Sequence, residues 1–428
     1  MPQSIRQWVE ANSKDILELN RRLVSLSSQN LYPDGEELQA QLEFNKILQQ
    51  IGFQTDVFLV TDVPGITEHE AFLNEGRKYD KRPNVVGVMK GTGGGRSLLF
   101  SGHMDTVPVG NEPWTKDPYG GEIEGDKQYG VGILDMKAGM VAAAMAAKCV
   151  KELGYTLKGD LIIESVVDEE YGGANGTLAC RLKGYQADAA IVPEPSNMAI
   201  CPAAQGGSYF RITFAGKSGR TYSGEKVVNP VYPAARFLDI VRLYHEWRNE
   251  HTPVHPLYVN NPELPTLVQV MRAGDVEFDL GDRVPSTCSF DVWIQCYPGV
   301  SEEELYNEFV SFCREKCKDD DLLKDNFPKI EKKLRFLYGT SMDVGHPILD
   351  TLKSVSREVT GKDLPVQGAP FACDSFIFNK FSPTPAVIFG LTGSNAHSTD
   401  EHIIVSDFLK MIEIYAAVII EWCGGEKR

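Results

Sequence analysis

The sequence predicts an α/β protein: a mixed, mostly parallel sheet flanked by helices, with an inserted α+β domain. Three observations carry this prediction. Short apolar runs rich in Val, Ile and Phe recur along the chain, a long Ala- and Met-rich stretch lies between two of them, and the pattern changes near residue 205. Strands that alternate with helices favour a layered domain built on a largely parallel sheet.

The N-terminal segment, residues 1–52, has the pattern of a helix. Leucines recur among charged residues, as on one face of a helix, and Gly52 stands where the pattern stops. We therefore expect this segment to be helical up to Gly52.

Apolar runs that end in small or polar turn residues are predicted as strands. They are 85–89, 97–101, 161–167, 188–192 and 385–389. The glycine-rich stretch 91–95, GTGGG, lies between the first two runs and lacks the Lys-Ser/Thr ending of a phosphate-binding loop. We therefore expect it to form a hairpin-like turn.

The stretch 136–153 predicts a helix whose small side chains allow it to pack closely on the sheet. The elements expected beyond it are a strand, a helix, two strands and a helix, at 208–216, 230–250, 265–272, 287–296 and 301–317. This order is that of a compact α+β insert. We expect one domain assembled from 1–204 and 332–428, and a second domain at 205–331.

The 428 residues carry a formal charge of −16. An acidic chain does not favour a phosphate backbone or an anionic membrane, so we expect neither as a partner. No apolar run reaches the roughly 18 residues of a spanning helix, and the first residues lack the apolar segment of a signal peptide. Nine cysteines, an odd number, favour reduced thiols and a cytoplasmic location.

Acidic residues and histidines follow the ends of the predicted strands. In an open α/β sheet, ligands bind beyond the carboxyl ends of the strands. The candidates that several strands and turns bring to this edge are His103, Asp105, Asp135, Glu169, Glu170, Glu194 and His397.

A lone carboxylate at a strand end is most often a helix cap or a solvated loop residue. The set is different, because so many acids at one edge would repel one another and shift their pKa values. One or two divalent cations would remove the conflict. Asp105 stands two residues after His103, where a carboxylate can fix the tautomer of a ligand imidazole.

Four segments resemble the signature blocks of a known family. They are SGHMDTVPVGNEPWTKDPYGGEIEGDKQYGVGILDMKAGM, VVDEEYGGANGT, IVPEPSN and GSNAHSTDEHI. The chain resembles the aminoacylase / acetylornithine deacetylase / succinyl-diaminopimelate desuccinylase / carboxypeptidase G family of dinuclear zinc hydrolases. The resemblance covers most of the domain expected at 1–204 and 332–428.

The resemblance implies a role for each candidate. His103 and Glu194 would bind one zinc, Glu170 and His397 the second, and Asp135 would bridge the two. Asp105 would orient the His103 ring, and Glu169 would be the general base that deprotonates a metal-activated water. The metals implied are two divalent ions, Zn²⁺ first, with Co²⁺ or Mn²⁺ as alternatives. The Asp135–Met136 bond would be cis, and the domain at 205–331 would be a lid and dimerisation domain.

The sequence departs from the family pattern at the expected substrate contacts. Arg220 stands where the family usually carries an oxyanion-stabilising histidine, and Gln295 where an arginine is common. Arg220 could bind an oxyanion or a carboxylate, or could be a solvated turn residue. Arg283 could compensate for Gln295. Asp374 resembles a family aspartate near the site, with a structural role expected.

These residues predict hydrolysis of a C–N amide bond in a small N-acylated amino acid or amine by a homodimeric enzyme. The departures leave room for an unusual amide or a formamide. One alternative is a dipeptidase or carboxypeptidase of the same family, acting on short peptides. Another is a catalytically silent metal- or ligand-binding protein on this fold, which would not need the general base Glu169.

Overall fold

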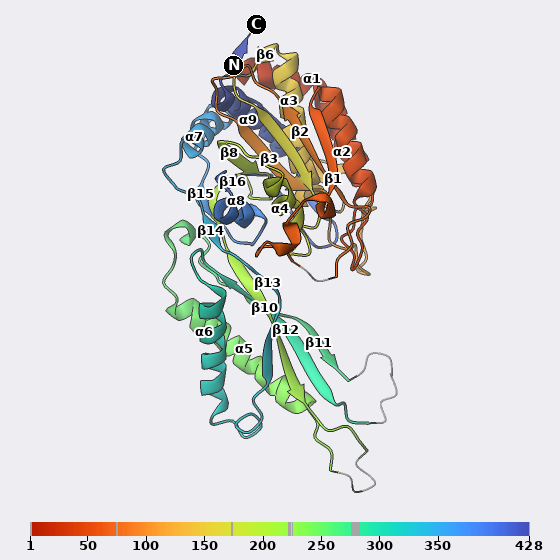
Figure 1. The fold of residues 1–428 in the computed structure, drawn as a ribbon, viewed down its shortest axis with the longest axis vertical. Coiled ribbons are helices and arrows are strands. Elements are labelled where there is room, and N and C mark those ends of the chain that lie inside the picture. The colour runs from red at the N-terminus through yellow and green to blue at the C-terminus, as the bar shows by residue number, and fades with distance from the viewer. Residues whose placement is uncertain are drawn as a thin grey trace. The chain divides into compact units, whose positions relative to one another are not determined.

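The computed structural model describes residues 2–73, 76–172, 174–220, 224, 226–274 and 283–427. The chain divides into two units, whose elements are labelled in Figure 1. Unit 1 comprises Met1–Ala203, Ser341–Ala369 and Cys373–Arg428, and unit 2 comprises Ala204–Thr340 and Pro370–Ala372.

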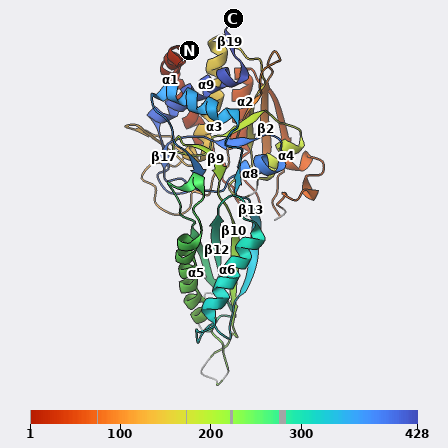
Figure 2. The ribbon, with the colours of Figure 1, turned by 90° about the vertical axis from the view of Figure 1, so that its left-hand side faces the viewer.

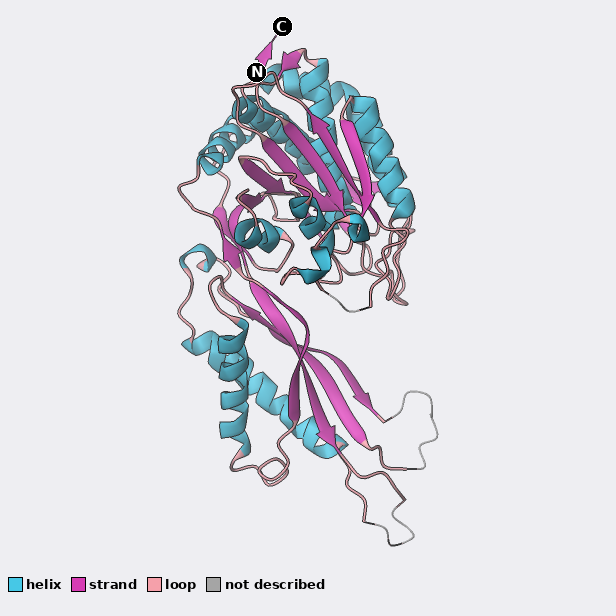
Figure 3. Ribbon diagram, in the orientation of Figure 1, coloured by secondary structure: helices cyan, strands magenta, loops and turns pink. Residues whose placement is uncertain are grey.

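Unit 1 is built on a mixed sheet, drawn in magenta in Figure 3. Seven of its nine strands, in spatial order, are β1 (Gln54–Leu59), β2 (Pro83–Met89), β7 (Leu161–Val166), β3 (Leu98–His103), β8 (Ala189–Val192), β16 (Ala386–Ile388) and β9 (Ile200–Ala204). The central strands β7, β3, β8 and β16 run parallel. Strands β1, β2 and β9 join antiparallel at the two sides. The predicted mixed α/β sheet is confirmed.

The turn predicted at 91–95 does not close a hairpin. Strand β7 pairs with both β2 and β3, so it separates the two strands that this stretch connects. The glycines serve close packing instead: a side chain at Gly91 would meet the carbonyl oxygen of Lys158 at 2.3 Å. The expectation of a hairpin was wrong because strand order depends on a segment about 70 residues further along the chain.

Helices cover both faces of the sheet. They are α1 (Pro2–Val24), α2 (Leu38–Ile51), α3 (Ala138–Glu152), α4 (Asn175–Leu182), α7 (Pro347–Thr360), α8 (Ser375–Phe381) and α9 (Val405–Cys423). Helix α2 packs Leu48 over Gly87 of β2, and Asn84 of the same strand donates to the carbonyl of Gly176 in α4. Since residues three apart on a strand point to opposite faces, α2 and α4 lie on opposite sides of the sheet (Figure 1).

The N-terminal segment forms two helices rather than one continuous helical run. Helix α1 ends at Val24 and α2 begins at Leu38, and its C-cap is Gly52 with a left-handed φ of 106°. The residues between them form an isolated bridge from Gln29 to Thr106. This connection carries Asn30 to the edge of the sheet where the candidate ligands lie.

A small sheet in unit 1 joins two segments that are far apart in sequence. Its order is β17 (Gly393–Ser394), β18 (His402–Ile404), β5 (Lys127–Tyr129) and β4 (Ile123–Glu124). Strand β18 pairs with β5, so the loop that follows β17 lies beside the loop that leads from β5 to α3. The first loop contains His397 and the second contains Asp135.

The remaining short elements complete the description. They are β6 (Tyr155–Thr156), β14 (Thr340–Ser341), β15 (Val366–Ala369), β19 (Glu426–Lys427), η1 (Val60–Asp62), η2 (Ile66–Glu68), η3 (Ile133–Lys137) and η5 (Pro256–Tyr258). In the described part of the chain, no helix combines the length and apolar character needed to cross a membrane.

Unit 2 is an antiparallel sheet with two helices on one face. The strands, in spatial order, are β11 (Thr266–Ala273), β12 (Thr287–Cys296), β10 (Gly206–Ala215) and β13 (Lys329–Leu337). Helices α5 (Val231–His251) and α6 (Glu302–Cys317) lie side by side against this sheet (Figure 2).

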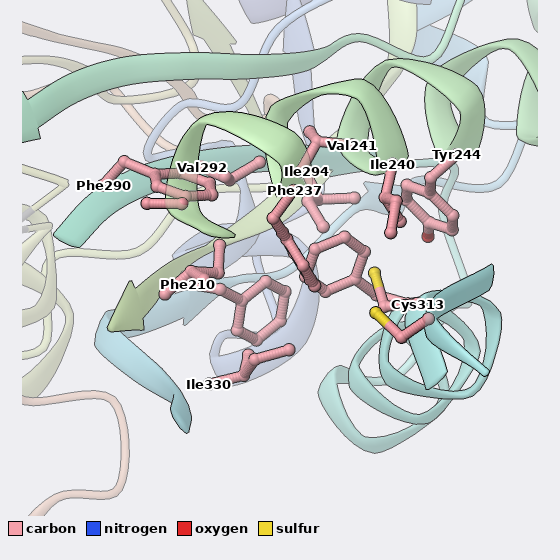
Figure 4. Close-up of a cluster of buried hydrophobic side chains, with 14 of the residues drawn as sticks. Phe210, Phe237, Ile240, Val241, Tyr244, Phe290, Val292, Ile294, Cys313 and Ile330 are labelled. Atoms are coloured by element: carbon pink, nitrogen blue, oxygen red, sulfur yellow. The ribbon is translucent and has the colours of Figure 1, made fainter. Parts of the chain in front are cut away.

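The core of unit 2 fills the space between this sheet and its helices. It contains Phe210 from β10, Phe237 from α5, Phe290 from β12 and Cys313 from α6 (Figure 4). Each buried phenylalanine contributes roughly 1.5–3 kcal/mol through removal of its ring from water. Unit 2 therefore has a hydrophobic core of its own.

Candidate metal centre

Three neighbouring parallel strands deliver candidate ligands to one edge of the sheet in unit 1. Strand β3 ends at His103, β7 leads to Glu169 and Glu170, and β8 leads to Glu194. The carboxyl ends of parallel strands meet at the same edge, so these side chains converge. The burial is high: His103 is 1% exposed and Glu194 4%.

Asp135 and His397 come to the same place from the loops that the small sheet joins. Asp135 lies in η3, directly before α3, and its peptide bond to Met136 is cis, as the family resemblance implied. His397 has a φ of 59°, a left-handed conformation that is uncommon for a side chain larger than Gly. Non-glycine residues in such conformations are enriched at functional sites.

The two carboxylate oxygens of Asp135 face two different imidazoles. Oδ1 lies 3.2 Å from Nε2 of His103, and Oδ2 lies 3.3 Å from Nε2 of His397. Asp135 therefore stands between the two histidines. This is the geometry that a carboxylate bridging two cations requires.

Glutamates complete each side of this arrangement. On one side, His103 Nε2 lies 3.7 Å from Glu194 Oε1 and 3.9 Å from Glu169 Oε2. On the other, His397 Nε2 lies 2.9 Å from Glu170 Oε2. The structure thus brings together the ligands expected from the sequence, with Glu169 beside them.

The His103 ring is oriented by Asp105, through an atom that the sequence did not indicate. Nδ1 of His103 lies 2.8 Å from the backbone carbonyl oxygen of Asp105 and 3.7 Å from its carboxylate Oδ1, which is too far for a hydrogen bond. The other carboxylate oxygen accepts from Asn30 at 2.7 Å and from the backbone N–H of Glu170 at 3.0 Å. Asp105 therefore leaves Nε2 of His103 free to face the carboxylates and also fixes the Glu170 loop.

Burial and mutual repulsion perturb the acid–base properties of this cluster. Burial lowers the pKa of His103, but its close contact with the Asp135 carboxylate, together with the other nearby carboxylates, raises it well above its ordinary value. Burial raises the pKa of Glu169 well above its usual range, and the negative charge of Asp374 adds to the effect. Burial likewise raises the pKa of Glu194, followed by the charge of Asp135. Such shifts indicate carboxylates crowded without sufficient positive charge.

The residues fit a divalent cation. Two overlapping groups, which share His103, offer ligand atoms within 4.8 Å of one another: His103 with Glu169 and Glu194, and His103 with Asp135 and Glu170. Among the described residues, the buried Nε2 of His103 has no hydrogen-bond partner. Imidazole nitrogens and carboxylate oxygens are the donors that Zn²⁺ and related divalent metals accept.

A buried ion network behind the cluster was not anticipated from the sequence. Asp168, with a left-handed φ of 70°, precedes the Glu169–Glu170 pair. Its carboxylate accepts from Arg77 Nε at 3.0 Å, from Arg82 Nη2 at 3.0 Å and from the Tyr79 hydroxyl at 2.6 Å. The sequence carried one signal of this network, the three consecutive acids at 168–170. Two of them were assigned to the metal site, and the third, Asp168, needs a positively charged partner of its own if it is buried.

The substrate residues expected from the sequence all lie in unit 2. Gly219 and Val284 form an antiparallel bridge, which places Arg220 opposite Arg283, both exposed. Gln295 is buried; its amide donates to Gln205 and, at 2.6 Å, to the carbonyl of Pro370. Gln295 thus ties β12 to neighbouring segments, and a substrate contact for it stays a prediction.

The chain belongs to peptidase family M20/M25/M40, whose model matches residues 99–421. The family resemblance drawn from the sequence is therefore confirmed, and the chain is a hydrolytic enzyme of the metallopeptidase and amidohydrolase class. The matched residues include every candidate metal ligand.

Particular relatives extend over nearly the whole chain. N-formyl-4-amino-5-aminomethyl-2-methylpyrimidine deformylase of Bacillus subtilis (strain 168) is 25% identical over an alignment 458 positions long, covering 99% of this chain and 98% of the relative. The solved structure of human carnosine dipeptidase 1 has a TM-score of 0.77 at 14% identity, covering 99% of each chain. A dinuclear metal-binding peptidase of Bacillus subtilis has a TM-score of 0.59 at 13% identity, covering 97% of this chain and 99% of its own. The two solved structures share the fold with this chain.

The network behind the cluster generates a prediction about stability. Arg82→Met removes the guanidinium that pairs with the buried carboxylates of Glu37 and Asp168. Loss of one partner from a buried ion pair leaves an uncompensated charge, so we expect the free energy of unfolding to fall by about 3–5 kcal/mol. Denaturant unfolding of the metal-free protein measures this.

The control is Lys78→Met, which removes a cation whose 3.6 Å contact with Asp34 is solvent-exposed. It should change stability by no more than about 0.5 kcal/mol. Equal effects of the two substitutions would contradict the importance of the buried network.

Proposed function

We propose that this protein hydrolyses the C–N amide bond of a small N-acylated amine or amino acid at a two-metal centre. The proposed ligands are His103 and Glu194 for one ion, Glu170 and His397 for the other, and Asp135 between them. Zn²⁺ is the first choice, with Co²⁺ or Mn²⁺ as alternatives.

The observation that carries the proposal is the position of Asp135 between two imidazoles. Its two oxygens lie at nearly equal distances, 3.2 and 3.3 Å, from His103 and His397. A single-metal site would not need a carboxylate with one oxygen directed to each of two histidine–glutamate pairs. The dinuclear metal-binding peptidase of Bacillus subtilis with the same fold supports two ions.

When bound, the two ions would polarise the amide carbonyl and acidify a water molecule. Glu169 is the base for that water: it is largely buried and lies 3.9 Å from His103 Nε2, beside the ligands but not between the histidines. It takes the proton from the water as the oxygen attacks the carbonyl carbon. It then returns the proton to the nitrogen that leaves, so that the amine departs neutral.

The surrounding residues fix this geometry. Asp105 holds the His103 ring through Nδ1 and the Glu170 loop through its carboxylate. Asp168, held by Arg77 and Arg82, fixes the backbone immediately before Glu169. Because the base is already held in place, its orientation costs little free energy at the moment of proton transfer.

For the substrate, the deformylase of Bacillus subtilis favours a formamide or another short acyl amide. We propose that Arg220 and Arg283, opposite each other in unit 2, attract an oxyanion or an anionic group of the substrate. The human carnosine dipeptidase 1 fold supports a dipeptidase as the second candidate. A silent binding protein is a weaker candidate, because Glu169 has no evident use in a protein that only binds.

We also propose that two copies associate through unit 2, and that the protein works in the reduced cytoplasm. Strand β11 is an edge of its sheet and exposes large apolar side chains on both faces: Leu267, Val268, Val270 and Met271, each between 36% and 50% exposed. Such an edge is a template for pairing with another strand. The nine cysteines are buried free thiols, which supports a reducing compartment.

The substrate class is tested by turnover on a panel of N-formyl, N-acetyl and N-succinyl amines and amino acids together with dipeptides. We expect turnover of at least one acyl amide, its loss after treatment with a chelator, and its recovery with Zn²⁺, Co²⁺ or Mn²⁺. Turnover of dipeptides alone would favour the second candidate. Chelator-resistant turnover would contradict metal dependence.

Two substitutions separate the base from the ligands. Glu169→Gln should keep two metal ions per chain but lower kcat by about 10²–10⁴-fold, because only the proton acceptor is lost. Asp135→Ala should lose metal, because both ions share that carboxylate. Elemental analysis and steady-state kinetics measure both. A fully metallated Glu169→Gln protein with the wild-type rate would rule out Glu169 as the base.

Association through β11 is tested by sedimentation velocity. The wild-type protein should sediment with twice the mass of one chain. Val268→Lys should shift it to the monomer, because a charge on an edge strand opposes pairing. Val254→Lys, at a 48% exposed position outside β11, should remain dimeric. A monomeric wild-type protein, or a dimeric Val268→Lys variant, would contradict the proposed interface.

A further inference from the structure

Glu401 is a buried carboxylate whose hydrogen bonds surround the backbone of Asp135. It is 2% exposed. One oxygen, Oε1, accepts from the N–H of Leu134 at 2.8 Å and of Asp135 at 3.0 Å, and Oε2 accepts from the N–H of Gly132 at 2.8 Å. Three backbone donors of one loop, within four residues, therefore converge on a single side chain.

The backbone of Glu401 holds the same loop. Its carbonyl oxygen accepts from the N–H of Gly130 at 2.9 Å. The next residue, His402, pairs with Tyr129 in the small sheet. Side chain and main chain together thus fasten the loop from residue 129 to Asp135 to the segment that contains Glu401.

That segment also carries His397, four residues earlier. It is anchored on its other side by Asp400, whose carboxylate accepts from the N–H of Thr115 at 2.8 Å and from its hydroxyl at 2.9 Å. His397 and Asp400 both have a φ of 59°, so the turn between them follows a tightly constrained path. Glu401 therefore connects the loop of Asp135 to the turn of His397, which face each other across 3.3 Å.

Three other buried glutamates of unit 1 differ from Glu401 in their partners. Glu37 is bound by Arg82, Glu164 by Arg181, and Glu413 by Arg6 and Lys410. These pairs neutralise a charge between helices and strands. The hydrogen bonds that the structure gives the Glu401 carboxylate are to backbone amides around Asp135, which is an arrangement suited to shaping a loop.

We propose that Glu401 is a positioning residue for the metal centre, which sets Asp135 at the right place and orientation relative to His397. The inference rests on the proposed two-metal function. Glu401 does not touch the ions; it acts through the backbone of Asp135. Groups that orient ligands in this way change metal affinity by about 10–100-fold when they are removed.

The test is metal binding by Glu401→Gln. Glutamine keeps the shape but offers one acceptor oxygen, so its NH₂ group must face either Gly132 or the Leu134–Asp135 amides, which are also donors. We expect metal affinity to fall by about 10–100-fold, measured by competition of the metal-free protein with a chromophoric chelator for Zn²⁺. Hydrogen exchange at Gly132, Leu134 and Asp135 should accelerate selectively.

The matched control is Glu413→Gln, which removes the charge of a carboxylate that is 5% exposed but bonded to side-chain cations in α1 and α9. It should leave metal affinity within about twofold of wild type, whatever it does to the thermal midpoint. If Glu401→Gln also stays within that range, or if both variants lose affinity in parallel with thermal stability, the positioning role is wrong.

Failure of the proposed function gives a different result. In that case, the wild-type protein itself would bind no divalent ions. If only the positioning role is wrong, the wild-type protein binds divalent ions tightly and Glu401→Gln binds them equally tightly. Should Glu401→Gln not fold, Glu401→Asp serves the same test. It keeps the charge but is one methylene shorter, so it cannot reach all three amides, and the same loss of affinity is expected.

Discussion

The concentration of negative charge around Asp135 is the constraint on which the rest of unit 1 depends. Its carboxylate shares a largely buried space with those of Glu169, Glu170 and Glu194, and two imidazoles are too few to balance them. Like charges out of water repel strongly, so the arrangement is stable only with protons or cations between them. A rigid parallel sheet keeps the side chains converging in spite of this repulsion.

Two buried carboxylates, Asp168 and Glu401, fix the loops that carry candidate ligands, and their own partners are of two kinds. Asp168 is held by guanidinium groups of Arg77 and Arg82, which compensate its charge fully. Glu401 is held by backbone amides, which satisfy its oxygens without adding a whole positive charge close to Asp135. The distinction matters because a cationic side chain beside Asp135 would compete with the proposed metals for its carboxylate.

Unit 2 has a different relation to function. Its sheet and helices enclose an aromatic core that is independent of the metal ligands. The features of unit 2 that could take part in binding lie on its surface. They are the apolar edge strand β11 and two arginines, Arg220 and Arg283, which one backbone bridge places opposite each other. Two adjacent permanent cations are suited to anions, which is why the proposed substrate contacts fall in this unit and the candidate metal ligands in the other.

The sequence by itself determined the strands of the parallel centre and the candidate ligands that follow them, because short β-rich runs with turn residues are local signals and parallel strands must end at one edge. It also predicted helices but not the break after Val24. Only the tertiary structure decided that β7 separates β2 from β3, that Asp105 orients His103 through its carbonyl, and that Glu401 holds the loop of Asp135. These contacts join residues far apart in sequence, such as Gly132 and Glu401, 269 positions apart, or depend on which atom of a residue faces its neighbour. No local pattern encodes either property.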